Sequence, residues 1–194
     1  MSEVEQADEL LVAHAQRGDA AAFGRLVERH QDALFNGIHR MVSQREDAED
    51  LAQEAFVKAF RALGGFQGRS SFYTWLYSIA VNLVISHRRK TGSARHLNPL
   101  SFQGGSDDEG RGLDVADDVE RPDHAAERRE MKQQVERAIA QLEDEFRTVI
   151  VMRDIEGFDY QTIADVLGCP SGTVKSRLHR ARLALRDQMK DLVG

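Results

Sequence analysis

The residues between Ser171 and Lys190 are those whose types and spacing most clearly suggest a chemical task. They include six basic side chains and one acidic side chain, and apolar residues recur among them at helical spacing. Duplex DNA carries an anionic backbone, and its major groove admits one helix. A helix with a buried apolar stripe and a basic outer face can therefore bind DNA. On a helical wheel, the stripe consists of Val174, Leu178, Ala181 and Leu185.

A short helix is predicted directly before this basic helix. Asp159 is a candidate capping residue for it, and Gly168-Cys169-Pro170 ends it. A short helix, a glycine-containing turn and a longer basic helix form a helix-turn-helix. The alternative is a solvated cationic helix in an ordinary bundle, but the coincidence of turn, cap and charge favours DNA binding. The residues that we expect to contact duplex DNA are Thr173, Lys175, Ser176, His179, Arg180 and Arg182, the last of them at a phosphate or in an intramolecular pair.

Aromatic and polar residues between Gly64 and Lys90 suggest a second, different nucleic-acid site. We predict a helix that starts after Ser70 or Ser71 and follows a glycine-containing loop. Its wheel directs Tyr73, Tyr77 and Arg88 outward and assigns Trp75 to core packing. Single-stranded bases are recognised by stacking and by edge hydrogen bonds. The candidate contacts are Phe66, Ser71, Tyr73, Tyr77, Asn82, Arg88 and Arg89.

Several carboxylates mark the helix that is predicted between Asp47 and Leu63. They have no His or Cys partners at metal-ligand spacing, so we predict no metal site, and taken alone they suit a solvated acidic face. The single Cys169 excludes an internal disulfide framework and a Cys-pair zinc site. The sequence has no phosphate-binding loop and no nucleophile–base motif. It therefore predicts neither a catalytic site nor a cofactor.

Charge divides the chain into three parts. Residues 1–100 carry 12 basic and 12 acidic side chains, residues 131–194 carry 10 of each, and residues 101–130 carry 4 and 10. The stretch from Thr91 to Pro122 is rich in Gly, Ser and Asp, so we predict a linker between two helical domains. No strand pattern favours a sheet, and the predicted class is all-α. No apolar run approaches membrane-spanning length and the N-terminus lacks the order of a secretory signal, so we expect a cytoplasmic protein without membrane insertion.

Three strings make the sequence resemble a known family. TIADVLGCPSGTVKSRLHRAR resembles the promoter-binding helix-turn-helix of extracytoplasmic-function sigma factors. DAEDLAQEAFVKAFRAL resembles their polymerase-docking segment, and FYTWLYSIAVNLVISHRRK resembles their promoter-melting helix. The similarity is greatest to the sigma-E type. It implies a region 2 domain at 1–90, an acidic linker at 91–130 and a region 4 helix-turn-helix domain at 131–194.

The resemblance also implies partners and roles. The chain would bind core RNA polymerase, read the double-stranded minus-thirty-five promoter element with residues 171–186, and open the minus-ten element as a single strand with residues 64–90. The linker would thread toward the polymerase active centre. The family implies a stress-response role and regulation by an anti-sigma factor. The polymerase-docking residues that the resemblance implies are Asp50, Leu51, Gln53, Glu54, Phe56, Val57 and Phe60.

Two other classes of protein are alternatives to a sigma factor. One is a free-standing helix-turn-helix regulator whose N-terminal domain senses a ligand or dimerises. The other is an enzyme with an all-α core, which no motif supports. A free-standing regulator binds duplex DNA alone, whereas a sigma factor needs core polymerase, so a binding assay separates them.

Overall fold

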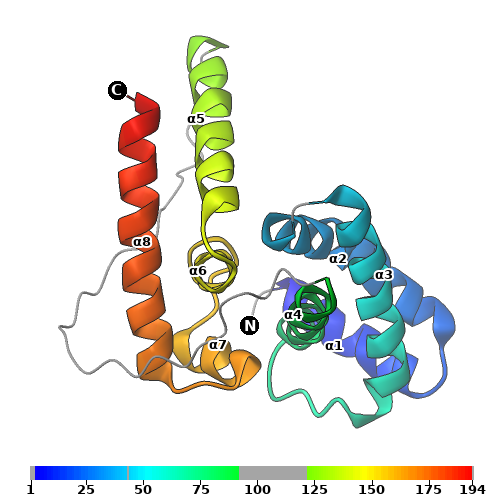
Figure 1. The fold of residues 1–194 in the computed structure, drawn as a ribbon. Helices are drawn as coiled ribbons and strands as arrows, with labels where there is room; N and C mark the ends of the chain where they lie inside the picture. The colour runs from blue at the N-terminus through cyan, green and yellow to red at the C-terminus, as the bar shows by residue number, and fades with distance from the viewer. Residues whose placement is uncertain (1–2, 43, 92–121, 194) are drawn as a thin grey trace. The chain divides into compact units, whose positions relative to one another are not determined.

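The computed structural model describes residues 3–42, 44–91 and 122–193 of the chain (Figure 1). In these ranges every regular element is helical, which confirms the predicted all-α class. The helices form two compact units, one before and one after the expected linker. Most of that linker, residues 92–121, lies outside the described residues. The helix that follows begins at Pro122, so the described part of the range 91–130 from Pro122 onward is helical.

The N-terminal unit is built around one long amphipathic helix. Its elements are α1 (Glu3–Gln16), α2 (Ala20–Met41), α3 (Arg45–Ala62), the 3-10 turn η1 (Leu63–Gly65) and α4 (Phe72–Lys90). Helix α2 packs against α1, α3 and α4, and α3 packs against α4 (Figure 1). The core contains Leu26, Leu34 and Ile38 of α2 with Leu76 and Val84 of α4, all buried. Each large apolar side chain buried in this way contributes about 1.5–3 kcal/mol.

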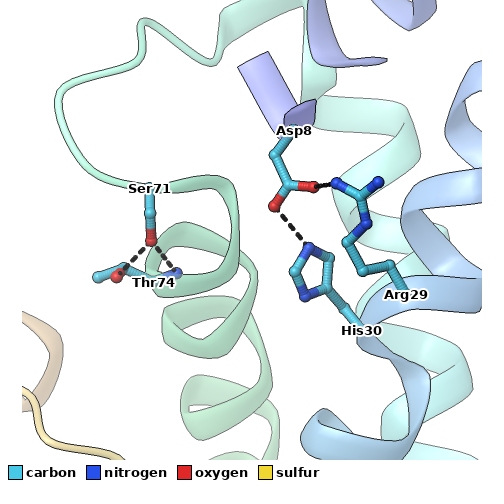
Figure 2. Close-up of polar contacts among 5 residues, drawn as sticks. All are labelled: Asp8, Arg29, His30, Ser71 and Thr74. Atoms are coloured by element: carbon cyan, nitrogen blue, oxygen red, sulfur yellow. Dashed lines mark hydrogen bonds and ion pairs between the residues drawn. The ribbon is translucent and has the colours of Figure 1, made fainter. Parts of the chain in front are cut away.

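Side-chain caps define where two of these helices begin. The carboxylate of Asp19 accepts a hydrogen bond from the backbone N–H of Ala22 at 3.1 Å and starts α2. The hydroxyl oxygen of Ser71 accepts from the N–H of Thr74 at 3.1 Å and starts α4 (Figure 2). Such caps satisfy backbone donors that have no partner inside the helix. The predicted cap at Ser70 or Ser71 is therefore Ser71.

The C-terminal unit has its helix-turn-helix at its C-terminal end. Its elements are α5 (Pro122–Gln141), α6 (Asp144–Ile150), the π-helical turn η2 (Val151–Ile155), α7 (Tyr160–Leu167) and α8 (Ser171–Val193). Helix α8 packs against α5 and α6 (Figure 1). Ile150, Met152, Ile163 and Leu178 fill the core of this unit.

A buried arginine closes the end of α5. Arg147 on α6 donates to the carbonyl oxygens of Ile139 at 3.2 Å, Ala140 at 2.5 Å and Leu142 at 2.8 Å. These carbonyls lie at the C-terminus of α5, where the regular helical bonds end, and the carbonyl of Ile139 also accepts from the N–H of Leu142 at 3.2 Å. Burial lowers the pKa of Arg147 below its ordinary value, but a guanidinium remains charged in a protein. Its charge therefore strengthens the cap and fixes the turn between α5 and α6.

Candidate nucleic-acid interface

Helix α7, the turn after it and helix α8 follow one another as in a helix-turn-helix, with a side-chain cap at the start of α7 and a glycine in the turn. One carboxylate oxygen of Asp159 accepts from the backbone N–H of Thr162 at 2.8 Å, and the other accepts from the Thr162 hydroxyl at 2.9 Å. These bonds, led by the one from the backbone, lower the pKa of Asp159. Gly168 takes a φ of 62° in the turn, a left-handed conformation that suits glycine. The cap and the break predicted from the sequence are both present.

Helix α8 presents different residues to the core and to the surface. Val174, Leu178 and Ala181 are buried, as the helical wheel predicts. On the other side, Lys175, His179 and Arg180 are exposed, while Thr173 and Ser176 are half-buried. The first turns of a recognition helix are the part that enters the major groove. The exposed side chains are therefore placed where base edges and phosphates can be reached.

Two arginines of α8 form ion pairs within the C-terminal unit. Arg177 lies 3.1 Å from the carboxylate of Glu145 on α6. Arg182 donates to Asp154 through Nε at 3.1 Å and through Nη2 at 2.7 Å. Of the two roles predicted for Arg182, the structure has the intramolecular pair. Its guanidinium is directed at Asp154, so the intramolecular alternative of the prediction is present in this structure.

Tyr160, the first residue of α7, has no predicted role, but its ring contacts two cations. The guanidinium carbon of Arg153 lies 4.8 Å from the centroid of its ring, and Nζ of Lys175 lies 5.8 Å from it. Both distances fit a cation–π contact. Lys175 of α8 is thus held against the first residue of α7. This contact joins residues 15 positions apart, and no local sequence pattern reports it.

An open cavity lies beside the start of α4 in the N-terminal unit. It has a volume of about 290 Å³ and is lined by Gly65, Phe66, Gln67, Arg69, Ser70 and Trp75. The rings of Phe66 and Trp75 are 4.8 Å apart between centroids. Trp75 is half-buried and packs on Phe72 with ring centroids 6.0 Å apart, as its predicted packing role requires, and it also lines the cavity. The structure adds Trp75 and Arg69 to the candidate base-binding residues.

The outward face of α4 differs from the prediction at two positions. Tyr77 is 1% exposed and Arg88 is 9% exposed, so neither lies on the surface. Arg88 instead donates a hydrogen bond to the carbonyl of Met41 at the end of α2. Helix α4 packs against α1, α2 and α3, and this surrounding packing buries more of its circumference than one stripe suggests. Both residues support the unit from within.

The other predicted contacts of α4 lie at the surface or at its edge. Asn82 and Arg89 are exposed, and the Asn82 amide donates to the carbonyl of Ser78 at 2.9 Å. Ser71 is half-buried and serves as the helix cap. Tyr73 is half-buried, and its ring stacks on His30 with centroids 5.4 Å apart. The stacking partner of Tyr73 comes from α2 and was not foreseen.

Helix α3 carries a mixed acidic and apolar surface. Among its candidate residues Asp50, Gln53 and Glu54 are exposed, and Glu54 pairs with Lys58 at 3.1 Å. Two apolar side chains accompany them on the exposed face, namely Val57 at 43% and Phe60 at 51% exposure. Leu51 and Phe56 are buried, which corrects their assignment to the docking surface. They pack beneath that surface and hold it in place.

Comparison with known proteins matches both units. Residues 26–94 match sigma-70 region 2, and residues 132–185 match sigma-70 region 4. The chain is 40% identical to the RNA polymerase sigma-H factor of Pseudomonas aeruginosa, with 97% of each chain covered. It is 37% identical to the ECF RNA polymerase sigma-E factor of Escherichia coli, with 96% of each covered.

Two solved structures resemble the whole chain. One is CnrH in complex with the cytosolic domain of CnrY, with a TM-score of 0.64, 28% identity and coverage of 95% of this chain and 98% of that one. The other is the sigma factor RpoE in complex with the anti-sigma factor NepR from Bartonella quintana. Its TM-score is 0.61 at 27% identity, and it covers 87% of this chain and 96% of that one.

Two helical units that match sigma-70 regions 2 and 4, the second with a helix-turn-helix, define a transcription initiation factor of the sigma-70 class. The chain belongs to the family of extracytoplasmic-function sigma factors. It is an alternative sigma factor, which binds core RNA polymerase and directs transcription initiation at specific promoters. Within the residues that the structure describes, no helix is both long and apolar enough to cross a membrane.

Proposed function

We propose that the two units of this sigma factor bind different parts of a promoter. Region 2 comprises residues 1–90, the linker residues 91–130 and region 4 residues 131–194. The observation that carries the division is the aromatic cavity between Phe66 and Trp75 in one unit, set against the basic recognition helix in the other. A base removed from its stack is bound by aromatic surfaces, whereas a duplex groove admits a helix.

In the N-terminal unit, the minus-ten element is bound as a single strand at the cavity and along α4. Phe66 and Trp75 supply stacking surfaces, and Arg69 supplies a cation beside them. Tyr73, Asn82 and Arg89 extend this surface along the helix. Tyr77 and Arg88 act from the core by keeping α4 in place.

In the C-terminal unit, the minus-thirty-five element is bound as a duplex by the first turns of α8. Lys175, His179 and Arg180 contact base edges or phosphates from the exposed face, and Thr173 and Ser176 assist at its border. The acidic residues of the linker keep DNA away from both units until core polymerase is bound. This follows from like-charge repulsion between carboxylates and phosphates.

Core polymerase binds the exposed face of α3. Val57 and Phe60 supply apolar area that the unit leaves uncovered, and Asp50, Gln53 and Glu54 surround them with acidic and amide groups. Apolar side chains provide most of the affinity of such a contact, whereas charges orient it. The partner surface that fits is an apolar groove with basic edges.

Three further features follow from the family. The protein acts in the cytoplasm, where the polymerase is, and has no enzymatic activity of its own. An anti-sigma factor regulates it, a proposal supported by the complex of the similar sigma factor RpoE with the anti-sigma factor NepR. It serves a stress response.

The deciding experiment is run-off transcription from a promoter library with core polymerase and the full chain. We expect transcripts from a small set of promoters, and little binding of duplex DNA by the chain alone. Phe66→Ala should reduce promoter opening while leaving binding of the upstream duplex by the holoenzyme intact. Tight, sequence-specific binding of the duplex without polymerase would instead indicate a free-standing regulator.

A further inference from the structure

Helix α1 precedes the part of the chain that matches sigma-70 region 2, which begins at residue 26. It nevertheless packs against α2, α4 and the turn η1, so it reaches both sides of the loop that lines the cavity. A helix in this position can do more than complete the core. The contacts of two of its polar side chains, Gln16 and Asp8, show which parts of the unit α1 stabilises.

Gln16, the last residue of α1, makes two hydrogen bonds to this loop. Its side-chain nitrogen donates to the carbonyl oxygen of Leu63 at 2.9 Å and to that of Phe66 at 2.9 Å. The two carbonyls lie on either side of Gly64-Gly65, and Phe66 is a wall of the cavity. Within the turn, the N–H of Phe66 donates to the carbonyl of Leu63 at 3.0 Å. The glycine pair remains conformationally free, and the two bonds from Gln16 restrict it further from outside the turn.

The position of Gln16 is itself fixed by the turn that follows. The N–H groups of Arg17 and Asp19 donate to the carbonyl of His14, and that of Gly18 donates to Ala15. Gly18 takes a φ of 99°, which allows this tight reversal. The amide of Gln16 therefore extends from a rigid point.

A buried polar cluster anchors the middle of α1, two turns before Gln16. The carboxylate of Asp8 accepts from Nη1 of Arg29 at 2.5 Å and from Nε2 of His30 at 2.7 Å (Figure 2). The side chain of Asp8 is 7% exposed, and both partners lie on α2. This cluster fixes α1 on α2 and thereby fixes Gln16 relative to the cavity.

We propose that Gln16 is a positioning residue for promoter opening: it holds the Leu63–Phe66 turn in the shape that accepts an unstacked base. The proposal rests on the proposed function of the cavity. Gln16 does not itself contact the base. Its two hydrogen bonds restrict the turn before the base binds. The turn therefore loses less conformational entropy on binding, which is preorganisation.

The test uses holoenzyme assembled from core polymerase and full-length Gln16→Met, which keeps the size and neutrality of the side chain and removes both donors. Gln16→Glu removes the same donors and adds a charge. Gln31→Met, at an exposed glutamine on α2, is the matched control. The measurements are the affinity of holoenzyme for a single-stranded minus-ten oligonucleotide, permanganate reactivity of the opened promoter, affinity for core polymerase, and the melting temperature.

We expect Gln16→Met and Gln16→Glu each to weaken oligonucleotide binding roughly tenfold, since two net hydrogen bonds are lost. Permanganate reactivity should fall with it, and preference among bases at the position that enters the cavity should relax. Affinity for core polymerase should match wild type in both Gln16 variants, and the Gln31→Met control should match wild type in every measurement.

Unchanged oligonucleotide affinity and base preference in Gln16→Met would overturn the proposal. So would a loss confined to Gln16→Glu, which would report charge repulsion from DNA, or a parallel loss of core binding and melting temperature, which would report general destabilisation. Failure of wild-type holoenzyme to bind the oligonucleotide would instead refute the proposed function.

Discussion

Arg182 and Asp154 form a two-point ion pair that joins the recognition helix α8 to the π-helical turn before the helix-turn-helix. Nε of the arginine is 3.1 Å from one carboxylate oxygen, and Nη2 is 2.7 Å from the other. The side chain of Asp154 is only 11% exposed, whereas that of Arg182 is 31% exposed. A planar guanidinium paired in this way is fixed in direction as well as in place. Arg182 therefore belongs to the scaffold that orients α8.

Replacing Arg182 with alanine should lower stability rather than remove a phosphate contact. Asp154 would be left without its two-point partner in a mostly buried position, so we expect a loss of about 1–3 kcal/mol after allowance for the partial exposure of the arginine. Thermal melts of Arg182→Ala, Asp154→Ala and the double variant measure the coupling between them. The salt dependence of promoter binding by the holoenzyme should keep its slope. A slope lower by about one charge would return Arg182 to the DNA contacts.

Arg180→Ala should change which promoters are used. Arg180 is exposed on the side of α8 opposite the buried stripe, where a base-edge contact is worth about 1–3 kcal/mol. Competitive transcription from randomised minus-thirty-five elements should therefore show relaxed preference at one position. Arg186→Ala, on the exposed later part of α8, is the control, and its preference should stay as in wild type. A uniform loss over all sequences in Arg180→Ala would show that this residue contacts a phosphate instead.

Substitutions on the exposed face of α3 should weaken binding of core polymerase without unfolding the N-terminal unit. We expect the double variant Asp50→Ala with Glu54→Ala, and the single variant Phe60→Ala, to weaken capture of core polymerase. Substitution of the two exposed carboxylates should change stability by about 0.5 kcal/mol. Phe60→Ala also removes an edge contact with the ring of Phe23, whose centroid lies 5.0 Å away, so it should cost about 0.5–1.5 kcal/mol more. Leu51→Ala is the contrasting variant, because its buried side chain should cost about 2–5 kcal/mol on truncation. Pull-down of core polymerase and a thermal melt on each variant decide the matter, and unchanged capture by the exposed variants would place the docking surface elsewhere.

How far the sequence predicted these sites depends on how many neighbours an element has. Helix α8 has one buried stripe, and a wheel drawn from Val174 and Leu178 separates its faces well. Helix α4 packs against three other helices, so the same method placed Tyr77 and Arg88 on the surface although both are buried. A single hydrophobic period cannot report a second packed face.

Contacts between distant residues form the other part that the sequence could not supply. Arg88 reaches the carbonyl of Met41, and Gln16 reaches those of Leu63 and Phe66, over separations of 47 to 50 residues. Each pairs a polar side chain with a backbone carbonyl, and carbonyls have no sequence signature. The helix caps at Ser71 and Asp159 were predictable because their partners lie three residues away.

Arg147 should be among the most important polar residues for the stability of the C-terminal unit. Replacing it with methionine keeps an unbranched apolar stem but leaves the carbonyls of Ile139 and Leu142 without its donors. Hydrogen bonds to charged groups contribute about 1.5–3 kcal/mol each, and their effects overlap, so we expect a loss of about 3 kcal/mol. Chemical denaturation of the full chain, followed by circular dichroism, should show the C-terminal transition moving to lower denaturant. Arg137→Met, exposed on α5, should leave it in place. Equal midpoints for Arg147→Met and wild type would show that water replaces the guanidinium at no cost.

The cap at Asp159 should make the helix-turn-helix sensitive to acid. Hydrogen bonds from Thr162 lower the pKa of Asp159 below its ordinary value of 3.8, so the folded state prefers the ionised form. The resulting stability is fully present above 3.8, and it is lost as pH falls through the lower folded-state pKa. Asp159→Asn keeps an oxygen that can cap α7 but cannot titrate. Between about pH 6 and about pH 3, the melting temperature of wild type should therefore fall further than that of Asp159→Asn.

The control is Asp165→Asn, which replaces an exposed acid later on the same helix and should follow wild type. If Asp159→Asn and wild type lose the same stability over this interval, the carboxylate of Asp159 contributes no more as an anion than as a neutral cap.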